Sequence, residues 1–388
     1  MKKAIKKLLT LWLCVILTMP LHMLYVEAGV EVSAPSAILI EASTGQVIYE
    51  KNATEQRSPA SITKIMTLLL AFEALENGSV SLSDSVLTSE HAASMGGSQV
   101  FLEAGETQDL ETMLKCIVVA SANDASVAVA EHIAGSEQGF VDSMNEKAVE
   151  LGMADTHFED CCGLSDSDLH YTSAKDVAIM SRELITKYPD IYDYTGIWME
   201  DFVHTTSRGE STFTLSSTNK LLKQYPYTTG LKTGSTSKAK FCVSATARKD
   251  DIDLIAVIMG CENGKTRFKE AASLLNYGFS VSRLYRDEND FALQGLPVKG
   301  ALEHSADIAF KEPFVYLDTE NRDISNIQKE LELPETVEAP VKEGQVAGYA
   351  IYRLNGQEIG KIEIVYTKNI EKAVFKDYFR KAFEDILF

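Results

Sequence analysis

The segment RSPASITKIMT, residues 57–67, decides which fold this chain is expected to adopt. Ser61 follows a Pro-Ala pair, and apolar residues then recur every three or four positions, which predicts a helix over residues 61–75. Lys64 lies three residues after Ser61, so the two side chains share one face of that helix, one turn apart. A helix start also supplies backbone N–H groups and the positive end of the helix dipole, which favour negative charge developing beside Ser61. The segment therefore predicts a serine nucleophile with a lysine beside it.

A second polar segment interrupts a long apolar region. Residues 110–120 and 124–134 are apolar almost all round and predict two buried helices. Ser121-Ala122-Asn123 stands between them, which forces a polar bend inside a buried region. The alternative is a purely structural one, in which Asn123 or Asp124 caps the second helix.

The third segment, Lys232-Thr233-Gly234, lies in sequence typical of a strand. Lys232 and Thr233 are candidates to bind a substrate carboxylate, and Gly234 allows a substrate backbone to approach the strand. The competing interpretation of the three segments together is a capped helix, a polar bend and a surface lysine.

These residue types suit catalysis by a serine and a lysine. A serine hydroxyl is a poor nucleophile until a base removes its proton. Lys64 can act as that base if burial and the nearby charge of Lys232 keep its amine neutral. Ser121 would then pass the proton to a leaving amine, and the backbone N–H groups of Ser61 and Ser235 would hold the oxyanion.

Composition and the N-terminus point to an exported globular protein. The 388 residues are 45% hydrophobic and 24% charged, which excludes a wholly disordered or multi-span membrane chain, and the net charge of −19 argues against nucleic acid as the main partner. Residues 1–28 have a basic start, an apolar stretch and small or medium residues before a cut after Ala28, so they predict a signal peptide. An uncleaved anchor is the alternative. The five remaining cysteines are odd in number and sparse, so neither a disulfide scaffold, a metal site nor a cofactor is expected.

The remaining pattern predicts two domains. One antiparallel sheet flanked by helices is expected from a hairpin over residues 37–50, helices over 140–151, 173–187 and 265–279, and strands at 231–232, 241–247 and 254–259. From residue 287 onward short alternating strands predict a small all-β domain. The expected divisions are a signal peptide at 1–28, a catalytic domain at 29–286, the all-β domain at 287–368 and an amphipathic helix at 369–388.

The three segments in this order resemble the motifs of the serine-type D-alanyl-D-alanine carboxypeptidases, the low-molecular-mass penicillin-binding proteins. The likeness extends to Leu151-Gly-Met153, Thr172-Ser-Ala-Lys-Asp176 and Thr218-Asn-Lys-Leu221, and it spans residues 34–285 with a β tail that also fits. It implies an α+β fold of the β-lactamase/DD-transpeptidase type, with a helical subdomain beside the sheet.

The resemblance also implies an activity. Ser61 would attack the D-Ala–D-Ala bond of a peptidoglycan stem pentapeptide, D-alanine would leave, and water would release the shortened peptide from the enzyme; penicillins would acylate the same serine. A DD-endopeptidase on the same scaffold, a β-lactamase and a non-catalytic peptidoglycan-binding protein are the alternatives. Against a β-lactamase, no Glu-x-x-x-Asn-like element lies between the second and third motifs.

Two positions depart from the family pattern. The family usually has Ala-Gly after the third motif, whereas here Ala239 precedes Lys240, a bulky cation that would alter the rim of the cleft. In some relatives an arginine on the next strands helps to hold the substrate carboxylate. Asp253 occupies the aligned position here, with Arg248 nearby, so the sequence does not place that arginine.

The last twenty residues predict a membrane-associating helix. Aromatic and apolar residues fall at helical spacing over 369–388, and eight charges exclude a spanning helix. A helix lying in the outer face of the cytoplasmic membrane is expected, and the resemblance favours it. The alternative is a helix packed on the β domain or on another subunit.

Overall fold

The computed structural model describes residues 30–206 and 208–387. The signal peptide expected at residues 1–28 lies outside the described residues. The N-terminal domain is built on one five-stranded sheet with the order β2-β1-β9-β8-β7, in which every pairing is antiparallel. Its strands are β1 (Ser36–Glu41), β2 (Val47–Lys51), β7 (Thr228–Thr236), β8 (Lys240–Lys249) and β9 (Ile252–Cys261).

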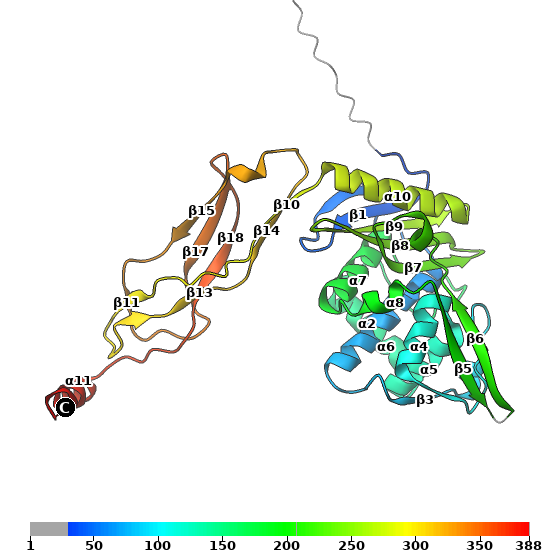
Figure 1. Ribbon diagram of the computed structural model, residues 1–388, viewed down its shortest axis with the longest axis horizontal. Coiled ribbons are helices and arrows are strands. Elements are labelled where there is room, and N and C mark those ends of the chain that lie inside the picture. The colour runs from blue at the N-terminus through cyan, green and yellow to red at the C-terminus, as the bar shows by residue number, and fades with distance from the viewer. Residues whose placement is uncertain (1–29, 207, 388) are drawn as a thin grey trace, which may run out of the picture. The chain divides into compact units, whose positions relative to one another are not determined.

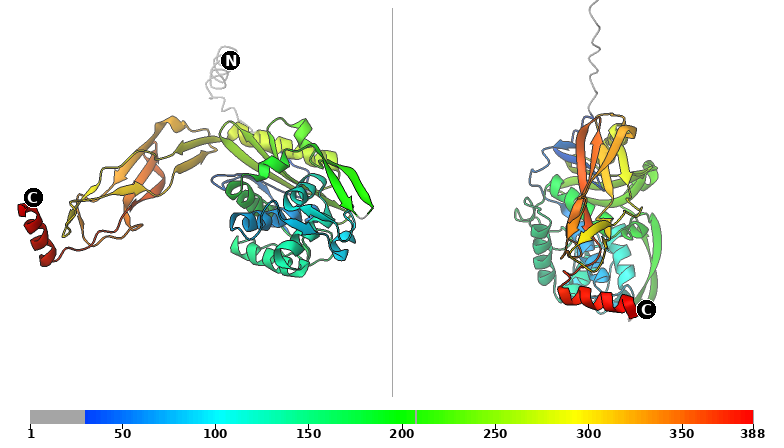
Figure 2. Two further views of the ribbon diagram at one scale, coloured as in Figure 1. Left: turned by 60° about the horizontal axis from the view of Figure 1, so that its bottom comes forward. Right: turned by 90° about the vertical axis from the view of Figure 1, so that its left-hand side faces the viewer.

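Helices cover both faces of this sheet (Figure 1 and Figure 2). Helix α10 (Gly264–Val281) packs on β8 and β9 from one side, and α7 (Ala174–Lys187) packs on β1 and β9 from the other. The central strand β9 is consequently buried along eight successive residues, which explains its continuous apolar run.

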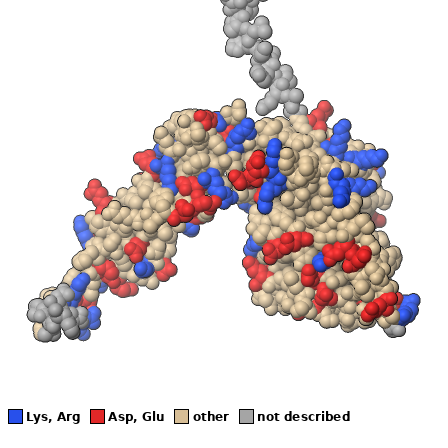
Figure 3. All heavy atoms as spheres, in the orientation of Figure 1, with Lys and Arg blue, Asp and Glu red and all other residues tan. Residues whose placement is uncertain are grey.

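A helical subdomain continues from the α7 side. Its helices are α2 (Lys64–Glu76), α3 (Glu90–Ala93), α4 (Leu110–Lys115), α5 (Asn123–Ala134), α6 (Glu137–Glu150), α8 (Ile191–Thr195) and the short α9 (Leu221–Gln224). It also contains two two-stranded sheets, β3 (Ser85–Leu87) with β4 (Thr107–Asp109) and β5 (Met199–Thr206) with β6 (Gly209–Ser216). Its interior joins the sheet in one apolar core. On the face in Figure 3, acidic side chains gather over this helical part.

The C-terminal domain is all-β, as expected. A four-stranded sheet, β13-β18-β17-β15, lies with two smaller sheets around a separate core in which Tyr352 stacks on Phe314. The strands are β10 (Arg283–Asp287), β11 (Leu296–Lys299), β12 (Ser305–Ala306), β13 (Ile308–Phe310), β14 (Phe314–Asp318), β15 (Ile327–Glu332), β16 (Val337–Glu338), β17 (Val346–Leu354) and β18 (Gln357–Tyr366). Since β10 pairs with β14, the division expected between residues 286 and 287 falls within a strand of this domain.

Two helix predictions differ from the structure. Ser61 lies in a short 3₁₀ turn, Ala60–Thr63, and the α-helix begins at Lys64. The helix expected over 369–388 is α11 (Phe375–Leu387). It starts later because Ile370 is buried and forms a backbone pair with Val341, which holds that stretch extended.

The five described cysteines are free and buried. Among the described residues no helix is long and apolar enough to cross a membrane.

Candidate active site

The 3₁₀ turn that carries Ser61 lies against β7, the strand that carries Lys232-Thr233-Gly234. A Cβ atom on Gly234 would stand 2.8 Å from the carbonyl oxygen of Pro59 and 3.1 Å from the backbone nitrogen of Ile62. Glycine is therefore required because the turn that carries Ser61 packs on β7, a reason different from the substrate approach expected from the sequence. This contact brings the first and third motifs together.

Lys64 is the centre of the site. Its side chain is fully buried, and Nζ donates to Oγ of Ser61 at 3.3 Å, to Oδ1 of Asn123 at 2.6 Å and to the carbonyl oxygen of Cys162 at 2.7 Å. Burial lowers the pKa of Lys64, although the nearby acidic groups, including Asp160, oppose the shift. A lowered pKa favours the neutral amine that a base needs.

The second motif occupies the bend between two helices. The apolar helix expected over 110–120 is α4 followed by one π-helical turn, Cys116–Ala120. The chain then reverses at Ser121, whose φ of 61° is left-handed, before α5 begins at Asn123. The Asn123 amide donates to the carbonyl of Gly96 at 2.7 Å and accepts from Lys64, and it does not cap α5, whose N-cap is Ala122.

Lys232 completes the arrangement from β7. Its Nζ donates to Oγ of Ser121 at 2.7 Å and to the carbonyl oxygen of Thr233 at 3.1 Å, and the side chain is almost fully buried. Burial lowers the pKa of Lys232 well below its usual range, and the charges of Lys64 and Arg267 lower it further. The hydroxyl of Thr233 is hydrogen-bonded to that of Thr218 at 2.7 Å.

A loop missed by the sequence analysis holds Lys64 in place. The carboxylate of Asp160 accepts backbone N–H groups from four residues, Cys162, Gly163, Leu164 and Ser165. These bonds fold the loop so that the Cys162 carbonyl faces Lys64. An Asp followed three residues later by Gly is a turn signal, but nothing in its spacing ties it to the Ser61 helix.

The sequence also missed Arg267. This buried side chain extends from α10, and its Nη1 donates to the carbonyl oxygens of Gly234 at 2.9 Å and Cys242 at 3.0 Å. Arg248, in contrast, forms an exposed ion pair with Asp253 at 2.6 Å, at the far end of the β8–β9 hairpin. The cation behind the third motif is therefore Arg267.

Lys240, the departure from the family pattern, occupies the tight turn between β7 and β8 with a φ of 58°. The left-handed conformation costs a residue with a Cβ atom roughly 1–2 kcal/mol. Glycine avoids most of that strain.

Lys240→Gly is accordingly expected to raise the free energy of unfolding by about 1 kcal/mol. Lys240→Ala, which removes the charge and keeps the strain, is the matched control and should stay within about 0.5 kcal/mol of the wild type. Urea unfolding measures both. Equal stability of the two variants would show that the turn carries no strain.

The geometry defines a class of protein: a serine acyl-transfer enzyme in which a buried lysine, not a histidine, lies beside the serine, on a helix-flanked antiparallel sheet. The sequence profile of the D-alanyl-D-alanine carboxypeptidases, peptidase family S11, matches residues 23–263, and that of the penicillin-binding protein 5 C-terminal domain matches residues 280–372. The chain belongs to the D-alanyl-D-alanine carboxypeptidase family and is a serine-type carboxypeptidase.

Individual relatives agree with this assignment. The chain is 41% identical to the D-alanyl-D-alanine carboxypeptidase DacF of Bacillus subtilis over 91% of its own length and 90% of the relative's. The crystal structure of penicillin-binding protein 5 from Haemophilus influenzae superposes with a TM-score of 0.75 at 27% identity. The match covers 88% of this chain and 98% of that structure. Penicillin-binding protein D2 of Listeria monocytogenes, solved in an ampicillin-bound form, gives a TM-score of 0.54 at 28% identity. The match covers 64% of this chain and 98% of that structure.

Proposed function

We propose that the protein removes the terminal D-alanine from peptidoglycan stem pentapeptides through an acyl-enzyme on Ser61, and that penicillins acylate the same residue. The observation that carries the proposal is the buried Lys64 amine, whose Nζ lies 3.3 Å from Ser61 Oγ and 2.6 Å from Asn123 Oδ1. In its neutral form this amine donates its two N–H groups to Asn123 and the Cys162 carbonyl, which leaves its lone pair to accept the Ser61 proton. Relatives named as D-alanyl-D-alanine carboxypeptidases support the substrate, and the ampicillin-bound structure supports the inhibitor class.

In the first half of the reaction, neutral Lys64 removes the hydroxyl proton of Ser61. The Ser61 oxygen then attacks the carbonyl carbon of the D-Ala–D-Ala bond, and the backbone N–H groups of Ser61 and Ser235 hold the oxyanion. Ser121, hydrogen-bonded to Lys232, transfers its proton to the amine as the C–N bond breaks and takes up in return the proton that Lys64 removed from Ser61, and D-alanine leaves. In the second half, water attacks the ester, which returns the serine and frees the shortened peptide.

The terminal carboxylate of the substrate requires a cationic partner. On β7, Lys232 contacts Ser121 of the second motif and Thr233 is bonded to Thr218, and Arg267 adds a fixed positive charge behind Gly234. We assign these residues to carboxylate recognition. Because the attraction is electrostatic, a substrate amidated at its C-terminus should be hydrolysed far more slowly.

The test of the function is D-alanine release from a synthetic stem pentapeptide, measured beside cleavage of a cross-linked muropeptide dimer. One equivalent of D-alanine per peptide and slow cleavage of the dimer are expected. Dimer cleavage without D-alanine release would favour the endopeptidase alternative. Neither product from folded protein would favour a non-catalytic binding role.

We also propose that the protein works outside the cytoplasm, with α11 lying in the outer face of the cytoplasmic membrane. Phe375, Phe379 and Phe383 are 84%, 62% and 57% exposed, an unusual concentration of aromatic surface on one helix. Tyr378 Oη donates to the Ala301 carbonyl at 3.2 Å, so one side of the helix remains free for lipid.

Removing residues 375–388 is therefore expected to release the protein from membranes. This cut spares Ile370, whose pairing with Val341 belongs to the β domain, so folding and D-alanine release should persist. Co-sedimentation with anionic lipid vesicles measures the effect, with Phe375→Glu/Phe379→Glu as a full-length control. Undiminished sedimentation of both proteins would contradict the proposal.

A further inference from the structure

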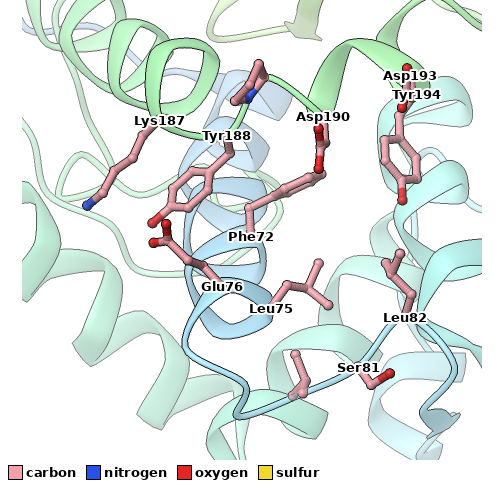
Figure 4. A pocket seen from close by; sticks show the side chains of 12 residues that line it. Phe72, Leu75, Glu76, Ser81, Leu82, Lys187, Tyr188, Asp190, Asp193 and Tyr194 are labelled. Carbon is pink, nitrogen blue, oxygen red and sulfur yellow. The ribbon is translucent and has the colours of Figure 1, made fainter.

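A pocket of about 620 Å³ lies at the opposite end of α2 from the active site. The thirteen residues of α2 place it about 18 Å along the helix from Lys64. It is lined by the end of α2, the loop at residues 80–82 and the segment that joins α7 to α8, and Figure 4 shows it from close by. Its volume is within the range of small-molecule sites.

The buried wall of the pocket is aromatic. Phe72, Tyr188 and Tyr194 are each more than nine-tenths buried. The ring of Phe72 lies 6.2 Å from that of Tyr188 and meets the Tyr194 ring edge-on at 5.8 Å. Aromatic faces attract organic cations through the negative charge density above the ring.

The rim of the pocket is negatively charged. Glu76, Asp190 and Asp193 line it, and all three are exposed. Helices α2 and α7 both end here, so the negative ends of two helix dipoles converge. The short α8 begins beside the pocket, but its start carries Asp190 and Asp193, which keep the local charge negative.

Lys147 lies near the pocket and Lys187 lines it, and both amines have carboxylate partners. Lys147 is bound to Glu73 at 2.9 Å and Glu150 at 2.6 Å. Lys187 lies 3.5 Å from Glu183, and although its amine is 5.7 Å from the Tyr188 ring, Figure 4 shows it pointing away from the pocket.

One buried polar atom in the wall has an unused acceptor. The hydroxyl of Tyr188 is buried, no described residue donates a hydrogen bond to it, and Figure 4 shows it beside the Glu76 carboxylate. Burial, with the charges of Glu73 and Glu76 and a hydrogen bond to Glu76, raises the pKa of Tyr188 to about 12. The hydroxyl oxygen can therefore still accept a proton donor from a ligand.

We propose that this pocket binds an alkylammonium group, as carried by a diamino acid side chain or a free diamine. The aromatic wall holds the alkyl chain, the carboxylates at the rim hold the ammonium, and the Tyr188 hydroxyl accepts one of its protons. A metal ion is a poor alternative, because the described residues contain no cluster of three His, Cys, Asp or Glu side chains able to hold one. The site does not depend on the role assigned to Ser61.

Isothermal titration of the full chain with pentylamine tests the proposal, with 1-pentanol as the neutral probe of similar shape. Saturable binding is expected for pentylamine, and binding about tenfold weaker or absent for pentanol. Glu76→Gln, Asp190→Asn and Tyr188→Phe should each raise Kd several-fold, whereas Asp142→Asn, an exposed carboxylate on α6, should leave it unchanged.

Protein acylated by penicillin should bind pentylamine equally well, which separates this pocket from the cleft at Ser61. Tighter binding of an N-acetyl-lysine amide than of 1,5-diaminopentane would identify a diamino acid residue as the source, and the reverse order a free diamine. Equal affinity for pentanol, loss of binding on acylation, or unchanged affinity in all three variants would overturn the proposal.

Discussion

Replacing Lys64 by methionine or arginine is expected to lower the rate of acylation by fluorescent penicillin by about 10³-fold or more. Methionine fills much of the same volume without a base. Arginine keeps a positive charge at every accessible pH and cannot accept the Ser61 proton. Because the Lys64 amine also binds Asn123 and the Cys162 carbonyl, both variants remove the base and its fixed position together.

Lys115→Met is the matched control for this substitution. Lys115 lies on α4, forms an ion pair with Glu200 at 2.7 Å and makes no contact with the three motifs, so its loss should leave acylation unchanged. Thermal unfolding of all variants separates a catalytic effect from a folding one. Acylation of Lys64→Met at more than about a tenth of the wild-type rate would assign the base elsewhere.

The same lysine sets the pH dependence. Burial lowers the pKa of Lys64 below 10.5, so the acylation rate should rise with pH and level off once the amine is neutral. The lowered pKa also affects stability. At pH values between the folded and the unfolded pKa of Lys64, the unfolded chain binds more protons than the folded one, so the free energy of unfolding rises with pH. An acylation rate that falls steadily from about pH 5 to about pH 9 would contradict a neutral lysine base.

Gly163→Ala is expected to cause the second large loss. Gly163 has a φ of 77°, and a Cβ atom there would lie 1.8 Å from the carbonyl oxygen of Ala60, the residue before Ser61. Neither backbone can yield without displacing the nucleophile turn or the loop that presents Cys162 to Lys64. A cost of about 2–5 kcal/mol in unfolding free energy is expected from strain and overpacking together, with acylation lost.

Gly152→Ala controls for the backbone conformation alone. Gly152 has a similar φ of 72°, and a Cβ atom added there would meet nothing within 4 Å. Its substitution should cost about 1–2 kcal/mol and leave acylation intact. Equal losses in the two variants would show that the contact with Ala60 is unimportant.

The chain's local patterns predict most of the fold. The amphipathic spacing in α7 predicts a helix, the short apolar run of β9 after a charged turn predicts a buried strand, and the alternating stretches with turns beyond residue 287 predict the β domain. The expected start of the Ser61 helix and the extent of the C-terminal helix were wrong because tertiary contacts decide them. The packing of Gly234 on Pro59 tightens the turn that carries Ser61. The pairing of Ile370 with Val341 keeps the residues before α11 in an extended conformation.

The part of the candidate site that could be predicted consists of side chains within short sequence motifs. Ser61, Lys64, Ser121, Asn123 and Lys232 meet through hydrogen bonds of the two lysines. The Cys162 carbonyl and Arg267 were not predicted, since a backbone acceptor has no residue signature and Arg267 acts from a helix on the face of the sheet opposite α7. Only the folded topology brings the Cys162 carbonyl to Lys64 and Arg267 to the third motif.

The most direct test of the account compares D-alanine release by the wild type and Ser61→Ala on a peptide ending in D-Ala–D-Ala, with mass spectrometry of the penicillin adduct. The account predicts release by the wild type, loss of release in Ser61→Ala, and one penicillin bound to the peptide that contains Ser61. Release that survives in Ser61→Ala, or a penicillin attached to another serine, would contradict it.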